Sequence, residues 1–198
     1  MKYNFRLMLK IGMIDMDNAF VKILDNISVY EVVNNIVPGS IYVVLVKYLT
    51  CFNILSGHDF YENVVLIYFI GLIISRIGSL IVESVLRYES KWWKAFLKFA
   101  PYSDYLQAEK LDETGRIRYL SMVNNMYCCM TSTAICVFLT LLFSYVWPFV
   151  SAKNGVINFM MIAGCILLIL LFAFSYRKQT NYVRSRVEKI LIFDKEKR

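Results

Sequence analysis

Histidine is nearly absent from this chain of 198 residues, because His58 is the only one. The motifs G-x-x-x-x-G-K-[ST], G-x-G-x-x-G, H-E-x-x-H and G-x-S-x-G, which bind phosphates or carry out hydrolysis, are also missing. His58 has no metal-ligand spacing around it, so we expect an ordinary surface residue. The sequence therefore predicts that the protein is not an enzyme and holds neither a metal ion nor a cofactor.

Charged residues are scarce as well, at 19%, whereas 58% of the residues are hydrophobic and the mean hydropathy is +0.51. That is too much apolar material for the surface of a soluble domain. The five cysteines all lie within or at the edge of apolar stretches, so we expect packing residues rather than a disulfide framework. The composition indicates an integral membrane protein.

Four apolar windows predict an all-α fold, a four-helix bundle of two transmembrane hairpins with cytosolic helical extensions. Short connectors with Ser-Gly and Asn-Gly turns join the windows in pairs. The expected parts are an amphipathic cytosolic or interfacial N-terminal helix (1–35), hairpin 1 (36–82), a cytosolic or interfacial helical loop (83–125), hairpin 2 (126–176) and a basic cytosolic C-terminal helix (177–198).

Basic residues are distributed very unevenly around these windows, with nineteen in the termini and the middle loop and one, Lys153, in the two connectors. Because short cytoplasmic loops retain Lys and Arg, both termini are expected in the cytoplasm of a bacterial inner membrane. Residues 1–10 are basic and no short apolar core follows them, so no cleavable signal peptide is expected.

The middle loop contains aromatic and basic residues of the kind that the lipid headgroup layer selects. They are Trp92, Trp93, Lys91, Lys94 and Lys98. We expect a helix over residues 87–102 that ends at Pro101 and anchors the loop at the membrane interface. The net charge of +7 is then explained by anionic membrane lipids as partners, and no direct nucleic-acid binding is expected.

A cytosolic helix is expected to follow, capped by Ser103 or Asp104 and separated by a turn at Gly115 from a second helix. Its acidic side could be a solvated helix face, a metal site or a surface for a basic partner. We expect these cytosolic helices and the basic tail to bind a partner. The residues assigned to partner binding are Asp104, Glu109, Asp112, Glu113, Asn124, Asn125, Arg184 and Arg186.

Charges also lie inside two of the windows, where each costs at least about 2.5 kcal/mol unless it faces protein or water. Lys47 lies in the first window, and the second contains a small, polar stripe of Arg76, Ser79 and Glu83. Arg76 and Glu83 are seven residues apart and should share a helical face, so we expect them to pair. Two interpretations remain open. In the first, Lys47 extends to the cytosolic headgroups and the charge of Arg76 is satisfied by Glu83 or by carbonyl groups. In the second, the stripe lines a polar cavity or an oligomer axis.

A set of short motifs between residues 60 and 130 resembles that of small four-span bacterial membrane proteins of anti-phage defence loci, in particular the membrane subunit of the Kiwa system. The motifs are Arg76-Ile-Gly-Ser-Leu80 with Glu83, Lys98-Phe-Ala-Pro-Tyr102, Asp104-Tyr105, Ala108-Glu109, Asp112 and Asn124-Asn125-Met126-Tyr127. Cys128 departs from the resemblance, which leads us to expect a basic residue there. The resemblance implies an oligomeric membrane sensor of phage attack that works with a cytosolic DNA-binding partner.

Two functions are consistent with these features. The first is an oligomeric sensor and scaffold that couples a membrane event to a cytosolic effector. The alternative is an oligomeric pore or ion channel, with Lys47 and Arg76 lining an anion-tolerant path. Ion flux across liposomes would favour the pore, whereas silent liposomes and a bound soluble protein would favour the scaffold.

Overall fold

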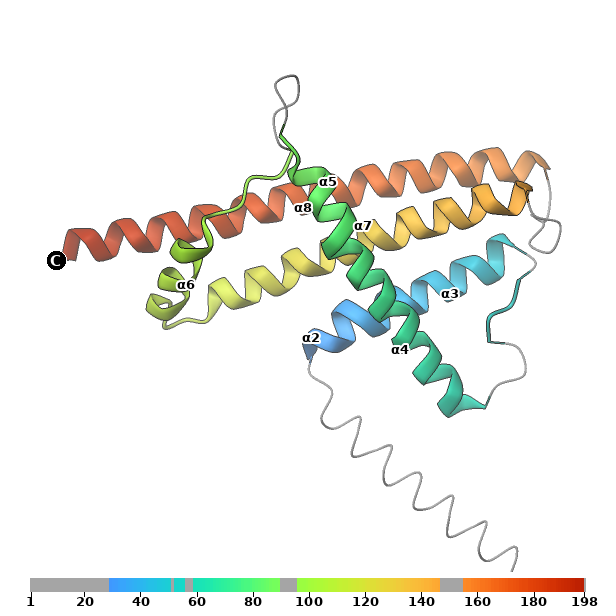
Figure 1. The fold of residues 1–198 in the computed structure, drawn as a ribbon, viewed down its shortest axis with the longest axis horizontal. Coiled ribbons are helices and arrows are strands. Elements are labelled where there is room, and N and C mark those ends of the chain that lie inside the picture. Colours follow the sequence, from blue (N-terminus) through green and yellow to red (C-terminus); the bar gives the residue numbers. More distant parts are fainter. Residues whose placement is uncertain (1–28, 51, 56–58, 90–95, 147–154, 198) are drawn as a thin grey trace, which may run out of the picture. The chain divides into compact units, whose positions relative to one another are not determined.

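The computed structural model describes residues 29–50, 52–55, 59–89, 96–146 and 155–197, and the regular elements in those residues are helices (Figure 1). In chain order they are α2 (Val29–Glu31), the π-helix η1 (Val32–Ile36), α3 (Val37–Leu49), α4 (Phe60–Ile77), the π-helix η2 (Gly78–Val82), α5 (Glu83–Arg87), α6 (Tyr102–Leu111), α7 (Arg116–Val146) and α8 (Gly155–Lys197). The chain divides into two compact units, 1–32 and 33–198. In the first, the described part is α2 and the first residue of η1.

Three helical stretches are long and apolar enough to cross a membrane, which confirms three of the four expected windows. They are Phe60–Arg87, Arg116–Ser144 and Met160–Glu196. The first window is not among them. It contains α3, whose 13 residues directly continue η1 and end at Leu49. The described residues therefore give three candidate spans rather than four.

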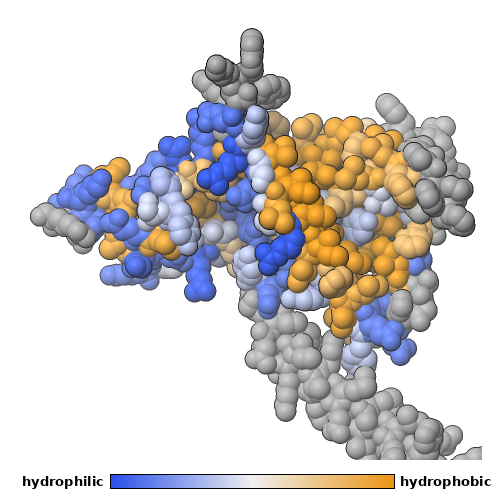
Figure 2. All heavy atoms as spheres, viewed as in Figure 1, coloured by the Kyte–Doolittle hydropathy of each residue, from blue (hydrophilic) through white to orange (hydrophobic). Residues whose placement is uncertain are grey.

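The helices α7 and α8 form a long antiparallel pair (Figure 1). Their 31 and 43 residues extend over about 46 Å and about 65 Å, so both exceed the hydrocarbon core. Val137, Leu141 and Cys165 are buried together near one end of the pair, and Ile117 and Val187 are buried together near the other. Figure 2 shows hydrophobic residues gathered over the first end and hydrophilic residues around α6 and the C-terminal half of α8.

The helices α3 and α4 pack closely because two glycines let their backbones touch. A Cβ atom on Gly39 would collide with the carbonyl oxygen of Ile67 and lie 2.9 Å from the nitrogen of Gly71. A Cβ atom on Gly71 would collide with the carbonyl group of Asn35. Small residues at such contacts are typical of helices that pack within a membrane.

The same helices also contact α7. The hydroxyl oxygens of Tyr42 on α3 and Thr140 on α7 lie 2.9 Å apart. Ser132 on α7 donates a hydrogen bond to the carbonyl oxygen of Ile74 on α4, at 2.9 Å. α7 is therefore the central helix of the unit, since it packs against α3, α4 and α8.

Between α5 and α6 the chain is less helical than predicted. The helix expected over residues 87–102 is wrong in its described part, because α5 ends at Arg87 and residues 97–100 have no regular structure. The Leu97 N–H donates to the carbonyl oxygen of Leu86 at 3.0 Å and so holds this segment against α5. Leu97 is buried in a cluster with Cys128 and Tyr176. Burial of this side chain explains why the segment packs against the helices instead of continuing α5.

The expected helix after Pro101 is confirmed, but its cap is not. α6 begins at Tyr102, and no side chain caps its first turn. The Ser103 hydroxyl instead donates to the Asp104 carboxylate at 3.2 Å. The predicted turn at Gly115 is confirmed by a φ of 63°, which glycine adopts without steric cost.

Candidate functional site

A polar junction lies where η1, α4 and α7 meet. Asn125 donates a hydrogen bond from its amide to the side-chain oxygen of Asn34, at 3.0 Å. The Sγ atom of Cys129 lies 3.5 Å from the hydroxyl oxygen of Ser75 and 3.9 Å from the side-chain oxygen of Asn34. Asn34 and Cys129 are each 1% exposed, and Ser75 and Asn125 are partly buried. Interhelical hydrogen bonds of this kind fix how membrane helices are placed against one another.

Both π-helical segments contact this stretch of α7. Asn34 belongs to η1, and Gly78 begins η2, where a Cβ atom would lie 3.3 Å from the Sγ atom of Cys128. The Ile74 carbonyl oxygen, one turn before η2, accepts hydrogen bonds from the Gly78 N–H and from Ser132. π-Helical turns are rare and occur frequently at functional sites. Two of them against one stretch of α7 make this junction the best candidate for a functional site in the apolar part of the chain.

Arg76 and Glu83 do not form the predicted pair. The described residues include both side chains, and no ion pair joins them; Glu83 instead accepts a hydrogen bond from the Tyr176 hydroxyl at 3.4 Å. The physical reason is η2, because a π-helical turn contains more residues than an α-helical turn and shifts the faces on either side of it. Residues seven apart across η2 therefore no longer lie one above the other.

The residues on either side of Arg76 contact the middle of α7. Its neighbours Ser75 and Gly78 contact Cys129 and Cys128. Cys128 packs with Tyr176, which directly precedes the polar half of α8, residues 177–197. α4 crosses α7 in this region (Figure 1).

The intramembrane polar residues do not converge on a cavity within one chain. Lys47 and Arg76 are both exposed, and the Ser79 hydroxyl donates to the backbone carbonyl oxygen of Arg76 at 3.2 Å. Of the α7 hydroxyls, Thr131 and Thr133 donate to carbonyl oxygens four residues earlier on their own helix, and Ser132 donates to α4. The donors of these hydroxyls are therefore occupied, and only their oxygens remain available as acceptors.

Two residues assigned to partner binding are occupied inside the helix group. Asn124 is buried and accepts a hydrogen bond from Thr180 on α8 at 2.9 Å. Beside it, Gln179 donates to the carbonyl oxygen of Leu120 at 3.2 Å. Asn125 belongs to the polar junction described above. In this structure Asn124 and Asn125 therefore connect helices of their own chain.

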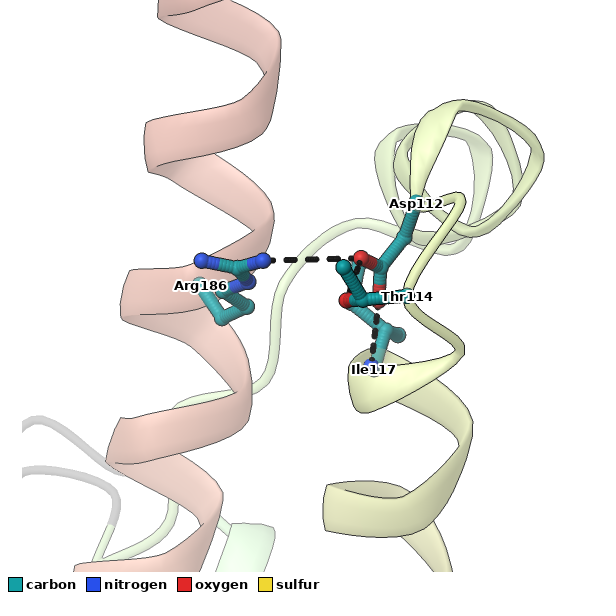
Figure 3. A network of polar contacts seen from close by, with 4 residues as sticks. All are labelled: Asp112, Thr114, Ile117 and Arg186. Atoms are coloured by element: carbon teal, nitrogen blue, oxygen red, sulfur yellow. Dashed lines mark hydrogen bonds and ion pairs between the residues drawn. The ribbon is translucent and has the colours of Figure 1, made fainter.

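A second site joins α6, α7 and α8 around the carboxylate of Asp112 (Figure 3). Asp112 follows the last residue of α6, and its carboxylate accepts hydrogen bonds from the Ile117 N–H and the Thr114 hydroxyl, both at 2.6 Å. Arg186 on α8 completes the network at 3.4 Å. The Asp112 side chain is 3% exposed. It caps the first turn of α7 and links that turn to α8.

Hydrogen bonding determines the ionisation of Asp112. Burial would raise its pKa, but hydrogen bonds from Thr114, the Ile117 N–H and Arg186, together with the positive charge of Arg186, lower the pKa below the ordinary value for an aspartate. Asp112 is thus a structural anion and not part of a solvated acidic face. The sequence signal that could have indicated this is an Asp placed just before a Gly-terminated turn and the start of a helix.

The other residues assigned to partner binding remain on the surface of the polar half, which consists of α6, the first turns of α7 and the C-terminal half of α8. Glu113 is exposed, Glu109 is partly exposed, and Asp104 accepts the hydrogen bond from Ser103. Arg184 forms an ion pair with Glu188, one turn later on α8, at 2.7 Å. Exposed apolar side chains lie among them on α6 and α8, including Leu106, Leu111, Tyr182 and Phe193.

Two arginines that sequence reasoning missed are held over aromatic rings. The guanidinium carbon of Arg87 lies 5.3 Å from the centre of the Phe99 ring. That of Arg177 lies 4.9 Å from the centre of the Phe96 ring. Both arginines are exposed, at the places where α5 ends and where the polar half of α8 begins. The alternation of aromatic and basic residues in the middle loop was the available signal.

Several predicted features lie outside the described residues. They are His58, most of the interface set (Trp92, Trp93, Lys91 and Lys94) and residues 1–28 of the expected N-terminal helix. Lys98 is described and exposed. Cys128, where a basic residue was expected, is 1% exposed and packs with Leu97 and Tyr176, so a charge at this position would be buried in an apolar cluster.

No family model, no curated protein and no solved structure matches the chain. The fold and the two sites define its class: an all-helical protein in its described residues, with three candidate membrane spans and a polar helical extension.

Proposed function

We propose that the chain is an oligomeric sensor and scaffold of a bacterial inner membrane that couples a membrane event to a cytosolic effector. The effector is a soluble protein, and the system is one of anti-phage defence, as the resemblance to the Kiwa membrane subunit implies. One observation carries the proposal: α7 and α8 run unbroken from the apolar half into a polar half that also contains α6. Such a pair provides a continuous mechanical connection between a membrane and the space beside it.

In the proposed topology, α3 with α4 and α7 with α8 form two transmembrane hairpins, and both termini lie in the cytoplasm. The nineteen-to-one distribution of Lys and Arg supports this orientation. The polar half of the α7–α8 pair is then cytoplasmic. Lys47, two residues from the end of α3, then lies towards the outer surface, where its ammonium group extends to the outer headgroups rather than the cytosolic ones.

The polar junction supports a route by which a membrane perturbation acts on the cytosolic half. η1 and η2 both contact the stretch of α7 that contains Asn125, Cys128 and Ser132. A change in the tilt of α3 or α4 must therefore either break these contacts or move α7. Because α7 continues into the Asp112 network, its movement changes the surface formed with α6 and α8.

The effector surface in this proposal is formed by α6 and the C-terminal part of α8. Glu109 and Glu113 provide its acidic groups and Arg184 a basic one, alongside the exposed apolar residues of α6 and α8. A specific interface needs about 20 to 30 residues from each partner, which the two outer connectors are too short to supply. Exposed apolar groups among charged ones are typical of a protein–protein interface.

The alternative is an oligomeric pore, and one observation favours it: Lys47 and Arg76 lie on exposed faces of α3 and α4 without an ion pair in the described residues. Since Lys47 and Arg76 are exposed, such a path would have to run between copies of the chain. Reconstitution into liposomes separates the two functions, because a scaffold leaves the ion permeability unchanged and a pore raises it.

The proposal is tested by expressing the chain with the products of its neighbouring reading frames and challenging the cells with phage. Reversing Glu109 and Glu113 to lysine should abolish protection and co-purification of a neighbouring product. The control is Asp59→Lys, which reverses an exposed acid just before α4, at the outer end in the proposed topology, and should leave both unchanged. The proposal is wrong if Asp59→Lys abolishes protection while the α6 reversals leave it intact.

A further inference from the structure

The two stacked arginines form a feature that the proposed function does not use. Arg87 and Arg177 lie over Phe99 and Phe96, whose positions in the chain are separated by Leu97 and Lys98. A guanidinium group stacked on a ring keeps its planar N–H groups directed outwards at the edge. Each arginine is thus held beside a ring and still has donors available for an oxygen ligand.

The rings are themselves fixed by packing. Phe96 contacts Phe174 edge to face with ring centres 5.5 Å apart, and Phe99 contacts Tyr176 in the same way at 6.5 Å. Leu97, between them, is 1% exposed. The segment therefore places two cations at defined positions beside α8.

The positive charge of Arg87 and Arg177 is not paired with a carboxylate in the described residues, although Glu89 lies two residues after Arg87. Glu83, the acid one turn before Arg87, accepts the hydrogen bond from Tyr176. Lys98 is exposed and adds a third cation. Such a group of cations favours an anionic ligand with several acceptor oxygens, such as a phosphate group.

Both arginines lie where apolar helix surface ends. Arg87 is the last residue of the candidate span Phe60–Arg87. Arg177 directly follows the apolar run of α8, and Phe174, three residues earlier, is 56% exposed, as expected of a side chain in contact with lipid. This level corresponds to the headgroup layer of a membrane, where anionic lipid phosphates are found.

We propose that Arg87 and Arg177, assisted by Lys98, bind the phosphate groups of anionic phospholipids in the adjacent leaflet. The inference rests on the proposed placement of the spans in a membrane and not on the sensing role. Lipid binding can therefore fail while phage protection persists, and the reverse can also occur.

The test measures lipid retained by the full-length protein. Protein purified in detergent is incubated with equal amounts of phosphatidylglycerol and phosphatidylcholine, and native mass spectrometry counts the bound molecules of each. Wild type should prefer phosphatidylglycerol. Arg87→Gln and Arg177→Gln should each lower that preference about fivefold, the factor for one basic residue at an anionic membrane surface. Arg118→Gln, an exposed arginine near the start of α7, is the matched control and should change nothing.

Two further measurements distinguish a specific site from general attraction. Arg87→Lys and Arg177→Lys keep the charge and lose the planar group, so they should also lower the preference for phosphatidylglycerol. They replace the glutamine variants in the test if one of those fails to fold. Inorganic phosphate should not displace the lipid. The proposal is overturned if Arg118→Gln lowers the preference as much as the other changes, if the lysine variants match wild type, or if inorganic phosphate competes completely.

Discussion

Arg186 donates a hydrogen bond to Asp112 at 3.4 Å, although the two residues are 74 positions apart in the chain. Asp112 comes directly after α6 and caps α7, and Arg186 lies on α8, so this contact joins all three helices of the polar half. Both residues were expected to face a partner, because acidic and basic surfaces can mate across an interface. Within one chain they face each other instead.

Replacing Asp112 by alanine should loosen the polar half. The change removes the cap of α7 and the partner of Arg186, so we expect a loss of about 1 to 2 kcal/mol in the free energy of unfolding. Amide hydrogen exchange in α6 and the first turns of α7 should become faster. The control is Glu113→Ala, which truncates the exposed neighbouring acid and should have little effect. Equal effects of both changes would show that the network is unimportant.

The same network should weaken in acid. Because the pKa of Asp112 is lowered in the folded chain, its contribution to stability is fully present above the ordinary aspartate pKa of about 3.9 and is lost as the pH falls through the folded value. The difference in thermal midpoint between wild type and Asp112→Asn should therefore be constant above about pH 4 and shrink below it. A difference that stays constant down to pH 2 would contradict the lowered pKa.

The contact between α3 and α4 should depend on Gly39 and Gly71. Alanine at either position places a methyl group against backbone atoms of the other helix, and overpacking of this kind costs about 1 to 3 kcal/mol. Unfolding in detergent should occur at a lower temperature for both variants. Gly164→Ala is the matched control, since a Cβ atom there meets nothing within 4 Å. If Gly71→Ala is as stable as Gly164→Ala, the two helices do not pack as described.

Composition and spacing predicted the helical class, three of the spans and the turn at Gly115, because each depends on a local property of the sequence. The pairing of Arg76 with Glu83 could not be predicted correctly, since it depends on whether residues 78–82 form an α- or a π-helix. At the start of this stretch Gly78 packs against Cys128 and Ser132 bonds to the Ile74 carbonyl oxygen, and both contacts come from residues about 50 positions away in the chain. The role of Asp112 likewise depends on Arg186, 74 positions away.

Double-mutant cycles should detect the actual partner of Glu83. Glu83→Ala and Tyr176→Phe remove the same hydrogen bond, so their combined effect on stability should be smaller than the sum of the two single effects, by about 0.5 kcal/mol or more. Glu83→Gln and Arg76→Gln should be additive within about 0.5 kcal/mol. Coupling between Arg76 and Glu83, without coupling to Tyr176, would restore the pairing expected from the sequence.

The central claim is that the polar half, with α6 and the C-terminal part of α8, lies in the cytoplasm and there meets an effector. Fusing alkaline phosphatase after Arg198 tests it directly, since this enzyme folds into its active form only in an oxidising exterior, and a fluorescent protein fused at the same position reports on the opposite side. The account predicts an inactive phosphatase and a fluorescent second fusion at comparable expression. An active phosphatase with a dark second fusion would place the polar half outside the cell and contradict the account.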